Sequence, residues 1–277
     1  MEVISRCAGK PTQFVAKLKN VVFLLSPSKQ HFKMSSTIVL ITGANQGLGF
    51  ECVKKLAAEQ PDYHILLCSR NADRGRQAAD KVVYLARGTT VEPLELDVTN
   101  DESIAKAAEY VKGKCGRLDV LFNNAGISDY PGVGFREAMN KVIETNAVSA
   151  ACVTEAFLPL LKKATNIPRL LFMSSGLGSI AMTLDPKSPF YGYIVKPYNT
   201  SKAAMNMLGA IYAVELGKDG IKVNLIDPGF RATNLNGYHE AGGKPEDGAL
   251  QACRMIVNTD KDGPHGTFSS NEGTVPW

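Results

Sequence analysis

Side chains that could act together on a carbonyl group lie in the second half of the chain. Tyr198 and Lys202 are four residues apart in a stretch with helical apolar spacing, so the phenol and the ammonium share one helix face. Ser174 and Ser175 follow the apolar run 169–173, which predicts a buried strand whose end reaches ligands at the edge of a sheet. A phenol can donate a proton to a carbonyl oxygen, and a hydroxyl can hydrogen-bond it. These residue types predict proton-transfer chemistry.

The Tyr-x3-Lys spacing is a weak signal by itself. Tyr110 and Lys114 match it too, although they lie in a charged helical stretch that precedes a strand. Tyr191 and Tyr193 have no lysine four residues later. Sequence context therefore favours Tyr198.

A glycine-rich turn in the first part of the chain could hold the second reactant. Residues 37–41 are apolar and β-branched, which predicts a strand buried on both faces, and a helical pattern begins after Gly47. Gly43 would permit the tight turn, Gly47 the approach of backbone N–H groups to a pyrophosphate, and Gly49 close helix packing. The helix N-terminus would attract the phosphates. The spacing G-x3-G-x-G departs from the general dinucleotide motif G-x-G-x-x-G.

Three motifs follow one another in the order found in one enzyme family. Thr-Gly-x3-Gly-x-Gly begins at Thr42, Asn-Asn-Ala-Gly at Asn123 and Tyr-x3-Lys at Tyr198. With these motifs the chain resembles the short-chain dehydrogenase/reductase family, and its end resembles the carbonyl-reductase-like branch. The resemblance implies an α/β fold: a three-layer Rossmann fold with a doubly wound parallel β-sheet of about seven strands and helices on both faces. It implies one NAD(P)-binding domain over residues 34–277.

The resemblance also implies a reaction, the NADP(H)-dependent reduction of an aldehyde, ketone or quinone to an alcohol. Tyr198 would be the general acid, and Lys202 would lower its pKa and bind the ribose hydroxyls. Ser175 would stabilise charge on the carbonyl oxygen, with Ser174 as the alternative. Asn146 would bend a helix predicted over residues 135–163 and hold a water linked to Lys202; the alternative is a surface asparagine.

The coenzyme contacts implied by the resemblance are spread over the ends of several predicted strands. They are Gly43, Asn45, Gln46, Gly47, Leu48, Gly49, Ser69, Arg70, Asp97, Val98, Asn124, Ala125, Gly126, Tyr198, Lys202, Pro228, Gly229 and Thr233. Asp97 would either face the adenine amino group or cap a local turn, and both alternatives stay open.

Two residues after the second predicted strand bear on the choice of coenzyme. An NAD-specific site usually has a carboxylate there, whereas this chain has Ser69 and Arg70, which could hydrogen-bond a 2′-phosphate. This favours NADP(H) over NAD(H). Gln46 points the other way, because many NADP-dependent relatives have Lys or Arg there. The alternative for Arg70 is a solvated turn residue.

Two further segments are predicted to line the substrate site. Residues 177–197 form an insertion between the serine and the tyrosine, and Phe190, Tyr191 and Tyr193 in it indicate an apolar or aromatic ligand, or simply a packed loop. Residues 237–248 show no periodicity and predict a mobile loop. The same reading predicts a helix over residues 72–86.

Composition and charge exclude several classes of protein. The chain has 277 residues, 44% hydrophobic and 21% charged, as in soluble globular proteins. Its net charge of +4 comes from residues 1–33, while the rest is nearly neutral, which argues against a nucleic-acid-binding surface. Six cysteines and four histidines are scattered without metal-ligand spacing, so no metal is expected, and reduced thiols suit the cytoplasm.

The basic segment 1–33 leaves three alternatives open. Its longest apolar run, residues 21–25, is too short for a membrane span. The segment could precede a natural start at Met34, form a disordered extension, or target the chain to mitochondria.

Other functions also stay open. An NAD-dependent alcohol dehydrogenase would use the same residues, and a non-catalytic NADP(H)-binding sensor or scaffold would use only the coenzyme site. A homodimer or homotetramer is consistent with the resemblance.

Overall fold

The computed structural model of the protein describes residues 36–277. The predictions for residues 1–33 lie outside the described residues.

Within residues 36–277 the chain forms one eight-stranded sheet in the order β3-β2-β1-β4-β5-β6-β7-β8. All neighbouring strands are parallel except β7 and β8. The strands are β1 (Thr37–Ile41), β2 (Tyr63–Ser69), β3 (Thr90–Glu95), β4 (Val120–Asn123), β5 (Arg169–Met173), β6 (Lys222–Ile226), β7 (Thr267–Ser270) and β8 (Gly273–Thr274). The order reverses between β1 and β4, so a crevice opens beyond their carboxyl ends, where doubly wound sheets bind ligands.

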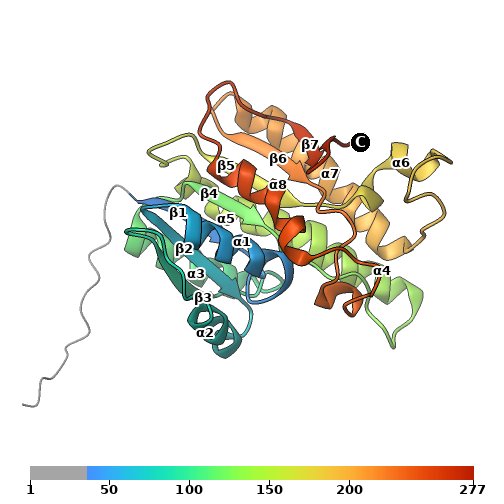
Figure 1. Ribbon diagram of the computed structural model, residues 1–277, viewed down its shortest axis with the longest axis horizontal. Helices are drawn as coiled ribbons and strands as arrows, with labels where there is room; N and C mark the ends of the chain where they lie inside the picture. The colour runs from blue at the N-terminus through green and yellow to red at the C-terminus, as the bar shows by residue number, and fades with distance from the viewer. Residues whose placement is uncertain (1–35) are drawn as a thin grey trace, which may run out of the picture. The chain divides into compact units, whose positions relative to one another are not determined.

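Helices cover both faces of this sheet. α1 (Gly47–Glu59) and α8 (Pro245–Val257) lie together on the near face in Figure 1. α3 (Asp101–Cys115), α5 (Ser149–Leu161) and α7 (Lys196–Gly217) pack on the opposite face. α2 (Ala72–Asp80) packs beside β3, while α4 (Phe135–Ile143) and α6 (Ile180–Leu184) lie to the right of the sheet in Figure 1. The predicted three-layer, doubly wound fold is confirmed, with the two-residue β8 as an additional strand.

Successive strand residues enter different cores, because side chains alternate across a strand. In β1, Ile38 and Leu40 join the core beneath α3, α5 and α7, whereas Val39 and Ile41 join the core beneath α1 and α8. All four are fully buried. The prediction of a strand buried on both faces is confirmed, and this burial fixes where β1 ends and the glycine turn begins.

Two predicted segments differ from the structure. The helix expected over residues 72–86 ends at Asp80, where Lys81 N and Val82 N bond carbonyls only three residues back. Farther on, Ala86 N bonds Ala57 O of α1. The loop expected over residues 237–248 ends where α8 begins at Pro245. A proline in the first turn followed by Glu246 and Asp247 is a helix-start signal that outweighs the missing periodicity.

Glu92 on β3 gathers three hydrogen bonds and provides a test of stability. Its carboxylate accepts from His64 Nε2 at 2.9 Å, from Lys114 Nζ at 2.7 Å and from Tyr110. The second Tyr-x3-Lys pair therefore belongs to an ion cluster on the edge strand β3. Burial alone would raise the pKa of Glu92, but the hydrogen bonds from His64, Lys114 and Tyr110 outweigh it and lower the pKa to about 2.

Glu92→Gln should lower the free energy of unfolding by about 1–2 kcal/mol at pH 7. Because the folded pKa is depressed, the carboxylate stabilises the protein above the pKa of the unfolded state, and this stabilisation is lost as the pH falls towards 2. Urea unfolding between pH 7 and pH 3 measures both effects. Glu109→Gln, which removes an exposed pair with Lys112, is the control and should change stability by less than about 0.5 kcal/mol. Equal losses in the two variants would contradict the role of the cluster.

Candidate active site

The ends of β1 and β4 are locked together at the crevice. Thr42 Oγ1 accepts hydrogen bonds from the backbone N–H groups of Asn124 at 2.9 Å and Ala125 at 3.0 Å. The Asn124 amide donates back to Thr42 O at 2.8 Å. Gly43 has φ +60°, and a Cβ there would lie 2.9 Å from Ala125 Cα. Only glycine fits this turn, and Thr42 is a site-forming residue that the motif reading did not single out.

The start of α1 is open to an anion. Its N-cap residue, Gln46, is exposed and makes no side-chain capping bond, and the first turn contains no acidic residue. Gly47 has φ +58°, and a Cβ there would lie 2.9 Å from Asn234 Oδ1. Free N–H donors at a helix start, next to a backbone without a Cβ, fit a pyrophosphate group. The buried Thr233 and its neighbour Asn234 lie beside this turn; sequence reasoning missed Asn234.

Ser175, Tyr198 and Lys202 come together at the carboxyl end of β5. The Ser175 hydroxyl lies close enough to Tyr198 to oppose the rise of the Tyr198 pKa. Lys202 Nζ lies 5.6 Å from the centre of the Tyr198 ring and donates to Met173 O, the last residue of β5, at 2.7 Å. Tyr198 is 9% exposed and Lys202 3%. The predicted helical i, i+4 arrangement is confirmed, and it places a phenol, a hydroxyl and an amine at one point of the sheet edge.

The two adjacent serines point to different partners. The hydroxyl of Ser174, which is 1% exposed, donates to Asn206 Oδ1 on α7, and the Asn206 amide donates to Gly178 O at 3.1 Å. Ser175 is only half-buried and faces Tyr198. The geometry thus favours Ser175 as the serine that can meet a ligand.

The protonation of the pair differs from the prediction for Lys202. Burial raises the pKa of Tyr198 to about 12, although the Ser175 hydroxyl opposes this shift. Burial also lowers the pKa of Lys202 to about 7. In the protein chain the lysine therefore carries only part of a charge at neutral pH, and Tyr198 stays protonated. For Tyr198, the rise in pKa caused by burial outweighs the lowering that a charged Lys202 was expected to cause.

Asn146 lies in a π-helical turn, Glu144–Val148, between α4 and α5. It is 0% exposed, so the alternative of a surface asparagine is wrong. Its Oδ1 accepts from Ile127 N at 2.8 Å, and its Nδ2 donates to Ile127 O at 2.8 Å and to Ser201 Oγ at 2.9 Å. Ser201 in turn donates to Tyr198 O at 2.7 Å. Asn146 thus links the loop after β4 to the helix that carries Tyr198, and its contact to a water stays a prediction.

The residues predicted to hold the adenosine end have mixed outcomes. The Ser69 hydroxyl is 2% exposed and donates to Asn71 O at 2.9 Å, so it is committed to a local turn. Arg70 is exposed and has no ion-pair partner among residues 36–277. Asp97 Oδ1 accepts from Thr99 N and Thr99 Oγ1, so its turn-capping alternative is present. The contact to a 2′-phosphate stays a prediction, and it would depend on Arg70 alone.

The other predicted coenzyme residues surround the crevice. A Cβ on Gly126 would lie 3.1 Å from Asn146 Oδ1 and 3.6 Å from Lys202 Nζ, and one on Gly49 would overlap Asn124. Asn45 is half-buried in the glycine turn, and Leu48 packs against Gly248. Val98 packs on the core, and the carbonyl of Pro228 accepts a hydrogen bond from Arg231.

Comparison with known proteins identifies the family. Residues 37–242 match the model of the short chain dehydrogenases. A short-chain dehydrogenase of Penicillium roqueforti is 37% identical over 83% of this chain and 90% of its own length. The chain belongs to the short-chain dehydrogenase family. It is an oxidoreductase of that family.

Carbonyl reductases are among the relatives of this short-chain dehydrogenase. Carbonyl reductase [NADPH] 1 of Bos taurus is 27% identical over 88% of this chain and 99% of its own length. The NADPH-bound carbonyl reductase from chicken fatty liver is 27% identical, with a TM-score of 0.71 over 87% of this chain and 99% of that chain.

The insertion of the short-chain dehydrogenase touches the site through one aromatic ring. A Cβ on Gly176, directly after Ser175, would lie 2.3 Å from Phe190 Cε2, so this ring covers the serine turn. Tyr191 and Tyr193 are 56% and 53% exposed. The last residues of the chain hold α6 in place: Ala181 N donates to Trp277 O at 3.0 Å and Ser179 Oγ to Pro276 O at 2.6 Å. The insertion thus contacts the Ser175 turn through Phe190, and its lining of a substrate site stays a prediction.

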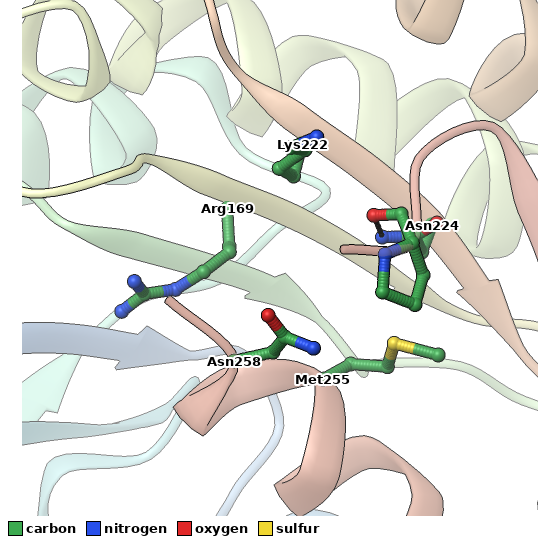
Figure 2. A pocket seen from close by; sticks show the side chains of 6 residues that line it. Arg169, Lys222, Asn224, Met255 and Asn258 are labelled. Carbon is green, nitrogen blue, oxygen red and sulfur yellow. Dashed lines mark hydrogen bonds between the residues drawn. The ribbon is translucent and has the colours of Figure 1, made fainter. Parts of the chain in front are cut away.

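Two hollows of the short-chain dehydrogenase are lined by other residues than the predicted catalytic and coenzyme-binding ones. One, of about 240 Å³, lies between α6 and the face of α7 that carries Asn199, Thr200 and Ala203, not the face of Tyr198. The other, of about 10 Å³, lies at the amino ends of β5 and β6, where Figure 2 shows Arg169 and Lys222. Its volume suits about one water molecule. Neither hollow is lined by a residue predicted to bind the coenzyme.

Residues 36–277 contain no group of three acidic, histidine or cysteine side chains placed to hold a metal ion. None of the helices in that range has the length and apolar character needed to cross a bilayer.

Proposed function

We propose that this short-chain dehydrogenase reduces an aldehyde, ketone or quinone to an alcohol with NADP(H), with Tyr198 as the proton donor. The observation that carries the proposal is that Ser175, Tyr198 and Lys202 come together at the carboxyl end of β5, at the same sheet edge as the open start of α1. This arrangement puts a proton donor and an anion-binding helix end on one crevice.

The coenzyme would be held along the carboxyl edge of the sheet. The N–H groups after Gly47 would bind the pyrophosphate, and Lys202 and Tyr198 would bind the ribose next to the nicotinamide. NADP(H), when bound, supplies the hydride. Gly43 and Gly126 carry no side chain, and Ala125 carries only a methyl group, where the coenzyme would pass.

The chain's own residues would handle the proton and the charge on oxygen. Tyr198 stays protonated at neutral pH because burial raises its pKa, so it can donate to the carbonyl oxygen. Ser175 would hydrogen-bond the same oxygen and stabilise its developing charge. Lys202 would stabilise the phenolate left behind, since a cation close to an anion offsets part of the burial cost. Asn146 and Ser201 hold the helix of Tyr198 in register with the loop after β4.

Arg70→Ala should weaken NADPH binding by about 10- to 100-fold and leave NADH binding within about twofold, because only NADPH has a 2′-phosphate for the guanidinium. Titration of coenzyme fluorescence measures both dissociation constants. Arg76→Ala, which removes an arginine of α2 that is paired with Asp73, is the control. Equal losses for the two coenzymes would show that Arg70 does not select NADP(H).

The proposal is tested with the purified full chain, NADPH and NADH. Coenzyme binding is titrated first, and absorbance at the nicotinamide band is then followed with panels of aldehydes, ketones and quinones. NADPH-dependent turnover would support the proposal. Turnover with NADH alone would favour an NAD-dependent alcohol dehydrogenase, tight binding without turnover a sensor, and no binding would overturn the coenzyme site.

A further inference from the structure

A buried carboxylate joins the two turns on either side of the candidate site. Asp227 follows β6 directly and is 6% exposed. Its Oδ1 accepts a hydrogen bond from Gly229 N at 3.0 Å. Burial raises the pKa of Asp227, and the backbone N–H groups of Gly229 and Gly176 oppose that shift. A Cβ on Gly176 would lie 3.0 Å from Asp227 Oδ2, so the carboxylate lies directly against the turn after β5. One side chain thus fixes backbone groups that are more than fifty residues apart in sequence.

Both of these turns carry residues of the proposed reaction. Gly176 comes immediately after Ser175, and Gly229 follows Pro228 in the turn proposed to contact the coenzyme. We propose that Asp227 is a positioning residue: it holds the Ser175 turn against the Pro228–Gly229 turn. This inference rests on the proposed function, because it assigns a task within that reaction.

The charged groups around Tyr198 determine the direction in which its pKa should shift when Asp227 is replaced. Three groups surround Tyr198: Ser175 in the turn after β5, Asp227 at the end of β6 and Lys202 on the same helix. The charged neighbours of Asp227 are Arg231 and Glu272. Burial and the Asp227 charge both raise the pKa of Tyr198. Removal of that charge should therefore lower the pKa of Tyr198.

The first measurement does not depend on activity. Amide hydrogen exchange of the full chain, labelled at glycine with ¹⁵N, reports the Gly176 and Gly229 N–H groups in wild type, Asp227→Asn and Asp227→Glu. In Asp227→Asn at least one of the two amides should exchange about tenfold faster, because an amide side chain offers one acceptor oxygen for two donors. Glu272→Gln, which removes an exposed carboxylate near Asp227, should leave both rates unchanged. Fast exchange of both amides in the wild type would overturn the inference, even if Asp227→Asn did not fold.

The second measurement is the pH profile of kcat/KM for carbonyl reduction. Asp227→Asn should lower kcat more than it changes KM for NADPH, and should move the alkaline limb down by about one pH unit. Asp227→Glu keeps the charge, so it should lower kcat while the limb stays at the wild-type pH. A wild-type enzyme that turns over, together with an Asp227→Asn variant of unchanged kcat and limb, would overturn this inference but not the proposed function. A wild type without turnover would count against the proposed function, and the exchange rates would still decide whether Asp227 holds the two turns.

Discussion

Tyr198→Phe should lower turnover by about 10²- to 10⁴-fold while NADPH binding stays within about threefold. The substitution removes only the hydroxyl that lies close to Ser175, and the ring keeps its place beside Lys202. The effect should therefore appear in kcat, measured by stopped-flow or steady-state absorbance, and not in the coenzyme dissociation constant.

Tyr212→Phe is the matched control for that experiment. Tyr212 lies on the same helix and is 6% exposed, and its hydroxyl donates to Glu155 Oε1 of α5 at 2.7 Å. Its removal should leave kcat within about threefold, since the phenol does not touch the proposed reaction. Retained turnover in Tyr198→Phe would remove this tyrosine as the proton donor.

Ser175→Ala and Ser174→Ala should have opposite effects on activity and stability. Loss of the Ser175 hydroxyl should lower kcat by about 10²-fold, as loss of one donor to a developing oxyanion does in other enzymes. Ser174→Ala should leave kcat within about fivefold but lower the free energy of unfolding by about 1–3 kcal/mol, because Asn206 Oδ1 loses a buried donor. Steady-state kinetics and urea unfolding measure kcat and the free energy of unfolding for both variants. A larger kcat loss in Ser174→Ala would reverse the assignment of the two serines.

Local sequence patterns were sufficient for the architecture. The apolar run 37–41 predicted β1, and the glycines predicted a turn whose positive φ angles at Gly43 and Gly47 the structure contains. The i, i+4 spacing of Tyr198 and Lys202 placed both on one face of α7. These features depend on neighbours in sequence, so periodicity and spacing describe them.

The features that sequence did not reveal depend on contacts between distant segments. The Thr42 bonds to Asn124 and Ala125 span more than eighty residues, and Asp227 joins turns that no spacing connects. The pKa of Lys202 depends on its burial against β5, which residue type does not show. The bond from Ser69 to Asn71 is an exception, because it is local but depends on the backbone path of the turn, which residue type does not show.

The hydrogen bonds from Ser179 and Ala181 to the last two residues bear on which parts of the chain could determine substrate preference. The wall beside Phe190 is anchored by Pro276 and Trp277, whereas the segment that matches the family model ends at residue 242. Substitutions at Pro276 or Trp277 are therefore expected to alter this wall while the family motifs stay unchanged. A classification of such enzymes by substrate would need to weigh these final positions alongside the motifs.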